Sequence, residues 1–233
     1  NRINALFTDS RGTLWVGDNN GVSTYDFVHD RFVKTDEDWS RFRVTDFDED
    51  EDGNIWIATN HGLIGYHPET EQYQWFTGTG NSNSSRQAIL PDTQIHKITC
   101  QPGGKIWFTS YEAGLFQLDT KSGTVKNYTT IGESDFGILR VSNLGFSANQ
   151  LFIGTNSGGL FIFNPEDETI INETFDNFGF IVRHFHLSDD SLVWLATNNG
   201  LISFDYFSRE FTRYINEPSN SLSINRTSVN YVF

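Results

Sequence analysis

The sequence is poor in cysteine, proline and methionine. Of 233 residues, one is cysteine, five are proline and none is methionine. The single Cys100 excludes an internal disulfide, and we expect it to be a small buried apolar side chain. No apolar run has the length of a membrane span, and no secretory signal sequence is present. Because methionine is absent even at position 1, we expect a segment of a longer protein.

Positive charge is also scarce. Lysine and arginine total 16 against 30 aspartate and glutamate, which gives a net charge of −14. Such a surface repels nucleic-acid phosphate and anionic lipid, so this segment is not expected to contact nucleic acid or to span a membrane. The chain also lacks a phosphate-binding loop, a Gly-x-Ser-x-Gly motif and a cysteine pair, and an enzymatic function therefore has no obvious nucleophile. The content of 37% hydrophobic and 15% aromatic residues excludes a disordered tail.

One sequence motif occurs five times along the chain. Its anchoring aromatic residues are separated by 41, 51, 45 and 42 positions, a period typical of β-propeller blades. The copies are LWVGDNNGVSTYD (14–26), IWIATNHGLIGYH (55–67), IWFTSYEAGLFQLD (106–119), LFIGTNSGGLFIFN (151–164) and VWLATNNGLISFD (193–205), anchored by Trp15, Trp56, Trp107, Phe152 and Trp194. The fold class is therefore predicted to be all-β, a propeller with one four-stranded antiparallel blade per repeat.

Each repeat divides into four predicted strands. Two hydrophobic residues three positions apart, such as Val44 and Phe47, indicate an inner strand with a local irregularity. An Asp/Gly turn, the apolar LWVG-type strand, an Asn-Gly-type hairpin and a third strand follow, and a polar edge strand closes the unit. The anchoring aromatics are expected to pack between blades. The predicted blades are residues 1–39, 40–80, 92–130, 138–176 and 179–216, and residues 224–233 are predicted to begin a sixth.

These repeats resemble the two-component regulator propeller repeat, with its hydrophobic pair, Asp, Gly, Leu/Ile-Trp-Ile-Gly-Thr, Gly-Leu and Tyr-Asp. The copies at 50–66 and 190–205 fit best, whereas the fourth copy has Phe152 in place of Trp and Asn149 in the Gly position. The resemblance implies a periplasmic sensor segment of a hybrid histidine kinase, often one that controls polysaccharide utilisation, or sometimes of a diguanylate cyclase. No kinase, receiver or DNA-binding segment lies within these residues, so signalling would occur elsewhere.

The residue before the first inner-strand hydrophobic is arginine in three repeats. Superposed repeats would bring these positions to one mouth of a propeller channel, where the planar guanidinium suits carboxylate or sulfate groups. An anionic glycan is the ligand that we expect, although these arginines could instead bind carbonyl groups or nearby acids. The candidate ligand-binding residues are Arg2, Arg43, Arg140, Asp46, His96, Lys97, Asn143, Arg183 and His184.

Two motifs could support other chemistry. Asp48, Asp50 and Asp52 match the first half of a calcium loop, but the later ligand positions are missing, so a solvated acidic turn is the preferred interpretation and no cofactor is expected. His184 and His186 lie two apart on an inner strand, and with His96 they could bind a metal. With Asp46 they could instead serve a propeller lyase or glycosidase. We interpret the chain as a non-enzymatic binding module, with these enzymes as the alternative.

Other surfaces could bind partners. Trp39 and Trp75 lie outside the repeated tryptophan position and could stack on a sugar ring, although packing of a loop is the preferred interpretation. The loop 78–85 lacks apolar residues, which predicts a flexible insertion where a partner could dock. Expected partners are an oligo- or polysaccharide and further blades or sensor domains of the same protein. A homodimer, or a purely structural propeller, remains an alternative.

Overall fold

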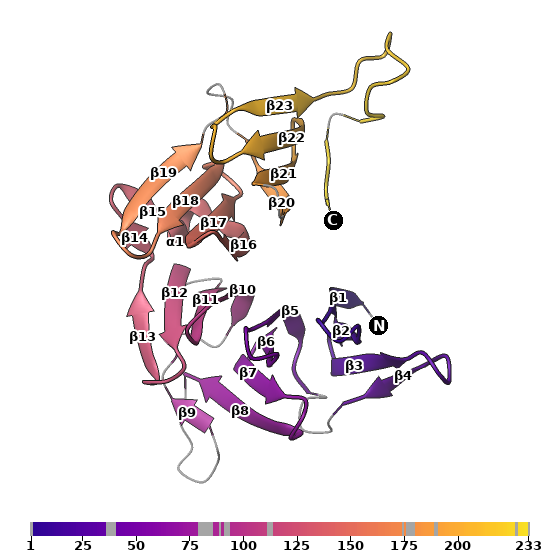
Figure 1. The fold of residues 1–233 in the computed structure, drawn as a ribbon, viewed down its shortest axis with the longest axis vertical. Coiled ribbons are helices and arrows are strands. Elements are labelled where there is room, and N and C mark those ends of the chain that lie inside the picture. Colours follow the sequence, from indigo (N-terminus) through magenta and orange to yellow (C-terminus); the bar gives the residue numbers. More distant parts are fainter. Residues whose placement is uncertain are drawn as a thin grey trace. The chain divides into compact units, whose positions relative to one another are not determined.

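The computed structural model describes residues 2–35, 41–78, 86–88, 90, 94–110, 114–173, 175, 180–188, 191–226 and 228–232. The chain divides into two compact units, Asn1–Thr130 (unit 1) and Ile131–Phe233 (unit 2). Five sheets contain four consecutive antiparallel strands each, and we call them blades 1 to 5 (Figure 1). The predicted all-β fold of five four-stranded units is therefore confirmed. Trp39 and residues 79–85 of the predicted docking loop lie outside the described residues.

Unit 1 holds blades 1 to 3. Blade 1 comprises β1 (Ile3–Thr8), β2 (Leu14–Asp18), β3 (Gly21–Asp26) and β4 (Arg31–Lys34). Blade 2 comprises β5 (Val44–Glu49), β6 (Ile55–Thr59), β7 (Gly62–His67) and β8 (Gln72–Thr77), and β9 (Arg86–Ala88) pairs in parallel with β8. Blade 3 comprises β10 (Ile95–Gln101), β11 (Lys105–Ser110), β12 (Gly114–Asp119) and β13 (Thr124–Asn127).

Unit 2 holds blades 4 and 5. It begins with β14 (Thr130–Ile131, which starts at the boundary), β15 (Ser134–Asp135) and a one-turn helix, α1 (Phe136–Leu139). Blade 4 comprises β16 (Val141–Ser147), β17 (Gln150–Thr155), β18 (Leu160–Asn164) and β19 (Thr169–Glu173). Blade 5 comprises β20 (Val182–Leu187), β21 (Leu192–Thr197), β22 (Gly200–Asp205) and β23 (Phe211–Tyr214). No other helix occurs in the part of the chain that is described.

Every inner strand carries the predicted irregularity. The pairing with the second strand shifts between the first and third residues of β1, β5, β10, β16 and β20, as in Val44 to Asp46. A bulge adds one residue to the strand, so hydrophobic side chains three apart point to the same side. Thr45, the residue at the bulge of β5, is thereby left out of the ladder with β6. The bulge explains why the hydrophobic spacing is three rather than two.

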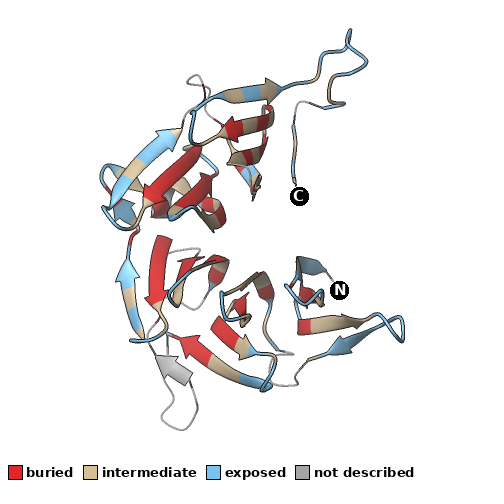
Figure 2. Ribbon diagram, in the orientation of Figure 1, coloured by how far each residue is buried: buried red, intermediate tan, exposed pale blue. Residues whose placement is uncertain are grey.

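The second and third strands hold most of the buried residues, whereas the outer strands are largely exposed except β8, whose last three residues are buried (Figure 2). β6 is buried at every residue, whereas β4 is exposed at every residue. The β6–β7 hairpin turns at Gly62, whose φ of 121° lies in the region that favours glycine. A Cβ atom there would lie 2.2 Å from the carbonyl oxygen of Phe76, so no larger residue fits. The predicted glycine hairpin is therefore confirmed by both the backbone angle and the lack of space.

Neighbouring blades pack through a repeated set of positions. The inner-strand pair of blade 2, Val44 and Phe47, lies against Gly17 of blade 1, where a Cβ atom would be 2.4 Å from a Val44 methyl carbon. In unit 2, Phe185 lies against Gly145 and Gly154 of blade 4 in the same way. A small residue in the second strand thus makes room for the inner strand of the following blade.

The predicted start of a sixth blade forms no strand in its described residues, 224–226 and 228–232. A strand requires a hydrogen-bonded partner, and no strand among the described residues pairs with this segment. The segment nevertheless lies against blade 5, because the Val229 N–H donates to the Thr197 carbonyl at 2.9 Å. Asn230 accepts a hydrogen bond from Arg183 at 2.7 Å. The segment therefore occupies a place beside β20 and β21 without strand pairing.

We expect Val44→Ser to destabilise the protein by about 2–4 kcal/mol, because it removes buried methyl groups and places a hydroxyl between blades. Ile3→Ser at the matching position of blade 1 should cost less than about 1 kcal/mol. Val44 is 1% exposed and Ile3 is 57% exposed. Urea unfolding of both variants measures the difference, and equal midpoints would contradict this account of blade packing.

Candidate functional site

The residue at the bulge holds two neighbouring blades together in three inner strands, β1, β5 and β16. Asn4 donates to the Val44 carbonyl at 3.1 Å, and Thr45 donates to the Ile95 carbonyl at 2.8 Å. Ser142 donates to the Val182 carbonyl in unit 2. Each acceptor is the first hydrophobic residue of the next inner strand. Inner strands of different blades do not pair through their backbones, so these side chains supply the hydrogen bonds between them.

The next position along the inner strand also connects blades. Asp46 accepts hydrogen bonds from the Ile98 backbone at 3.2 Å and from Lys97 Nζ at 3.3 Å. Buried Asn143 donates to the Phe185 carbonyl at 3.1 Å in unit 2. The predicted ligand-binding residues Asp46, Lys97 and Asn143 therefore have partners within the fold. A ligand would have to compete with those partners or bind beside them.

The arginines that precede the inner strands differ from these residues, because their side chains have no partner within the described fold. The backbone of Arg43 is fixed by Asn60, whose side chain accepts from the Arg43 N–H at 2.8 Å and whose N–H donates to the Arg43 carbonyl at 3.0 Å. The Arg140 carbonyl likewise accepts from the Asn156 N–H at 3.1 Å. Arg2, Arg43 and Arg140 are all exposed, and no ion pair or side-chain hydrogen bond joins them to any described residue. The backbones of Arg43 and Arg140 are anchored while all three guanidinium groups face solvent.

Arg140 has a further unusual feature. Its φ is 54°, a conformation that non-glycine residues seldom adopt. Strain of this kind costs about 1–3 kcal/mol and persists only where surrounding contacts enforce it. Here the residue directly precedes β16, and the Asn156 hydrogen bond holds it in place.

The predicted histidines have separate environments. His184 is partly buried, and its ring stacks on Tyr231 with 3.8 Å between ring centroids. His186 is exposed on the same side of β20, two residues further along. His96 is partly buried at the bulge of β10 in unit 1. Arg183, exposed beside His184, is held by Asn230. Unit 2 thus brings together a cation and two stacked rings, from β20 and the chain segment beside it.

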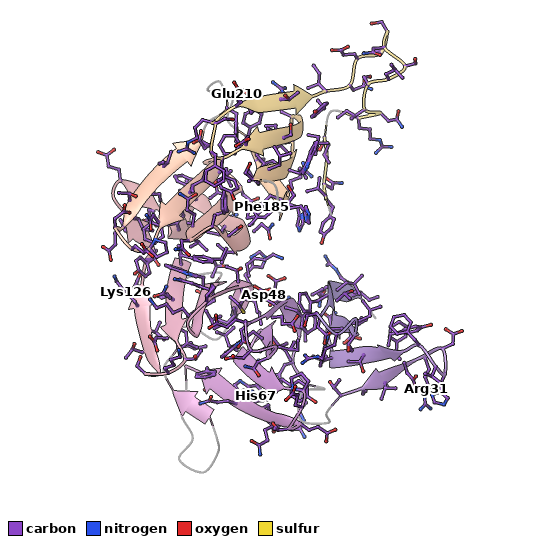
Figure 3. All side chains as sticks on the ribbon, viewed as in Figure 1. Arg31, Asp48, His67, Lys126, Phe185 and Glu210 are labelled. Atoms are coloured by element: carbon purple, nitrogen blue, oxygen red, sulfur yellow. The ribbon has the colours of Figure 1, made fainter. Side chains whose placement is uncertain are left out.

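Asp48 carries a strongly perturbed carboxyl group. It lies on β5 and accepts a hydrogen bond from the Cys100 backbone N–H of blade 3 at 2.7 Å (Figure 3). Burial raises the pKa of Asp48 to about 6, although backbone N–H groups and the Thr99 hydroxyl oppose this, and the nearby Asp46 adds repulsion. Burial also raises the pKa of the free Cys100 thiol, which packs against the core but is only partly buried, not fully buried as expected. A carboxylate thus joins blades 2 and 3 at an energetic cost near neutral pH.

Asp50 has a structural task that the sequence motif did not indicate. Its carboxylate accepts from Trp56 Nε1 at 2.9 Å and from the Asn54 backbone at 2.9 Å. The anchoring indole donates the same bond in two other blades, from Trp15 Nε1 to Asp9 at 3.0 Å and from Trp107 Nε1 to Gln101 at 2.7 Å. In the fourth repeat the aromatic is Phe152, which has no N–H. The sequence could have predicted this hydrogen bond, because the acceptor stands six residues before the tryptophan in all three repeats.

The candidate calcium ligands therefore act separately. Asp48 binds the backbone of blade 3, Asp50 binds the turn and the indole of its own blade, and Asp52 is exposed. Across the described ranges, no group of three His, Cys, Asp or Glu side chains could hold a metal ion. Trp75, a candidate for sugar stacking, is instead 2% exposed and packs edge-on to Phe42. The preferred interpretation of Trp75 as a packing residue therefore holds, because β8 places its side chain inward.

Sheets of four antiparallel strands, bulged at the inner strand and joined by aromatic and small residues, define this chain as a β-propeller. The sequence model of the two-component regulator propeller family matches residues 1–20 and 43–61, which hold the start of the first two blades. The resemblance of these repeats to that family is thereby confirmed. No curated protein matches the chain in sequence. No helix in the described residues is long and apolar enough to cross a membrane.

Solved structures with the same fold include extracellular domains of two-component systems and lyases. The extracellular domain described as that of a hybrid two-component system of B. thetaiotaomicron is 21% identical, with a TM-score of 0.66 over 100% of this chain and 37% of that chain. A second such domain from B. thetaiotaomicron is 18% identical, with a TM-score of 0.58 over 97% of this chain and 37% of that one. Virginiamycin B lyase from Staphylococcus aureus is 17% identical, with a TM-score of 0.66 over 93% of this chain and 71% of that chain. The chain thus spans about 37% of the length of the two extracellular domains.

Proposed function

We propose that this chain is part of the extracellular or periplasmic sensor propeller of a two-component regulatory system, and that it responds to an anionic glycan. The family match and the fold of the B. thetaiotaomicron extracellular domains support a sensor propeller. In this proposal a histidine kinase outside these residues receives the signal. The chain contributes recognition rather than chemistry.

The proposal of an anionic ligand rests on a difference among the predicted site residues: some are bonded within the fold, and others are exposed. Asp46, Lys97 and Asn143 hold neighbouring blades together, whereas the exposed arginines have solvent-facing guanidinium groups. In a chain of net charge −14, cations kept free of the many carboxylates are available to an anion. Guanidinium groups bind carboxylate or sulfate through two parallel hydrogen bonds, so an acidic polysaccharide fits them better than a neutral one.

A lyase is the second candidate function, because virginiamycin B lyase shares the fold. His184 and His186 would supply the proton-transferring groups on one side of β20. Against this, the His184 ring stacks on Tyr231, and Asp46, the acid that the sequence suggested as its partner, is paired with Lys97. Loss of turnover of an acidic glycan in His186→Ala, with binding retained, would favour the lyase.

Calorimetry with oligogalacturonate tests the sensor proposal. The triple variant Arg2→Ala, Arg43→Ala, Arg140→Ala should bind at least about tenfold more weakly, since loss of one charge-assisted pair costs about 1.5–3 kcal/mol. The folding stability should change little, because the three side chains have no partner among the described residues.

A matched control removes the same charge elsewhere. Lys34, Lys121 and Arg226 are also exposed, and replacing all three by alanine changes the net charge equally. This control should retain oligogalacturonate binding. If the arginine triple variant and this control bind oligogalacturonate equally well, the three arginines do not form the binding site. Any attraction of the glycan to the protein would then be non-specific.

A further inference from the structure

Three aromatic rings pack in series at one end of blade 2, and the outermost of them faces solvent. The buried Trp75 packs edge-on against Phe42, with 4.6 Å between the ring centroids. Phe42 is partly buried, and its ring centroid lies 4.7 Å from that of the exposed His61. Trp75 Nε1 also donates to the His61 carbonyl at 3.3 Å, which fixes the backbone that carries the outer ring. The imidazole of His61 is therefore an exposed ring with an aromatic support behind it.

Two arginines flank Phe42 in the sequence, and both are exposed. Arg43 is one of the arginines of the proposed function, and Arg41 lies two residues before it. Two hydrogen bonds, of 2.8 and 3.0 Å, join the backbone of Arg43 to Asn60, the residue next to His61. The two arginines and the exposed ring therefore belong to adjoining chain segments at the same end of blade 2.

Blade 5 repeats the support of this ring series. Phe180 stands two positions before the first hydrophobic residue of its inner strand, as Phe42 does in blade 2. Arg213 occupies the outer-strand position of Trp75, and its guanidinium lies 5.6 Å from the Phe180 ring centroid. Arg213 Nε donates to the Asn199 carbonyl at 2.8 Å. An aromatic residue and an outer-strand donor thus hold the hairpin in both blades, so this part of the arrangement is structural.

Blade 5 lacks the exposed part of the arrangement. Ile181 occupies the position of Arg43, and Asn199 occupies that of His61. The hairpin of blade 5 is held by the same kind of bond without a cation or a ring at these places. Folding of the hairpin therefore does not require the side chains of Arg43 and His61, which are available to a ligand.

We propose that Arg41, Arg43 and His61 form a subsite for a single acidic sugar residue, an inference that rests on the proposed function. A hexuronate has C–H groups on the faces of its ring and a carboxylate at its edge. The C–H groups pack against the negative face of an aromatic ring, which His61 presents with Phe42 behind it. A guanidinium binds the carboxylate through two parallel hydrogen bonds. A neutral sugar would use only the ring, and an inorganic anion only the arginines.

Calorimetry of the 233-residue chain with oligogalacturonate and with its methyl ester tests charge and ring separately. Arg41→Ala should weaken the binding of oligogalacturonate about tenfold and leave the binding of the uncharged ester unchanged. His61→Ala should weaken the binding of both ligands about three- to tenfold, because both keep the sugar ring. His61→Phe should restore most of the lost affinity, since it replaces the ring.

The Trp75 indole N–H reports directly on this subsite, because it is bonded to the His61 carbonyl. Its NMR signal is the one that Trp75→Phe removes. Oligogalacturonate should shift this signal in the original protein but not in His61→Ala. Lys34→Ala, which removes an exposed cation of blade 1, and Asn199→Ala, at the position of His61 in blade 5, are matched controls. Both should bind oligogalacturonate as the original protein does.

Failure of the subsite and failure of the proposed function give different results. The subsite alone is overturned if the arginine triple variant loses oligogalacturonate binding while Arg41→Ala or His61→Ala retains it in full. A Trp75 signal that does not move when oligogalacturonate binds would have the same meaning. An original protein that binds no oligogalacturonate would overturn both the subsite and the proposed function.

Discussion

Trp56→Ala should destabilise the protein by about 3–5 kcal/mol, a larger loss than we expect from Val44→Ser. Trp56 is 5% exposed and packs with Ile95 and Ile98 of the following blade. Its ring also lies against Gly65, where a Cβ atom would approach within 3.0 Å. Alanine would leave a cavity between two blades that the rigid sheets could fill only in part. Urea unfolding followed by circular dichroism measures the loss.

Trp56→Phe separates packing from hydrogen bonding. Phenylalanine keeps an aromatic ring but leaves Asp50 without its 2.9 Å indole donor, so we expect a smaller loss of about 1–2 kcal/mol. Phe207→Ala is the control for an aromatic residue in solvent, because Phe207 is 74% exposed. It should shift the unfolding midpoint very little. A Trp56→Ala variant as stable as Phe207→Ala would contradict the role of the anchoring aromatic.

Asp48→Asn should raise the stability of the protein near neutral pH by about 1–2 kcal/mol, the cost of the buried charge less that of one lost hydrogen bond. Burial raises the folded-state pKa of Asp48 to about 6 from its ordinary 3.8. The folded protein therefore holds a proton on Asp48 more tightly than the unfolded chain does. The stabilisation from the protonated group is complete below about pH 4 and disappears as the pH rises through 6. Asparagine can still accept the Cys100 N–H without carrying charge, but its NH2 group cannot accept the Glu49 N–H that Asp48 Oδ1 accepts at 2.9 Å, which reduces the gain.

The measurement is the urea midpoint of both proteins between about pH 4 and about pH 8. The gain from Asp48→Asn should be small at about pH 4 and should grow until about pH 7. Asp52→Asn, which changes an exposed carboxylate four residues away, should follow the original protein at every pH. Parallel pH profiles for the original protein and Asp48→Asn would refute the assignment of this cost to Asp48.

The repeat pattern predicted the blades because it depends on local rules. Hydrophobic residues three apart required an irregular inner strand, and each inner strand carries a bulge at that place. Glycine at position 62 required a tight hairpin, and its φ is positive. Such features depend on a few consecutive residues and on the sterics of the chain. The sixth inner strand was harder to predict, because a strand also needs a partner, and residues 224–226 and 228–232 form none.

The candidate site was predicted less completely. The sequence showed that polar residues follow the first hydrophobic residue of each inner strand, but it gave no means of separating contacts within the fold from contacts with a ligand. Asp46 reaches the backbone of residue 98, and Asn143 reaches that of residue 185. These partners lie 52 and 42 positions away, so only the packing of blades reveals them. The same packing of blades leaves the side chains of Arg2, Arg43 and Arg140 exposed to solvent.

By itself, the sequence determined the all-β class, the number of blades and the positions of the anchoring aromatics, because period, turn chemistry and strand pattern are properties of each repeat. The tertiary structure decided which polar side chains join blades and which carboxyl group has its pKa raised by burial. Asp48 and Asp52 stand in one acidic run, yet one is held against blade 3 and the other faces solvent. Burial and hydrogen bonding depend on what lies across the interface, and identical local sequence patterns can face different neighbours.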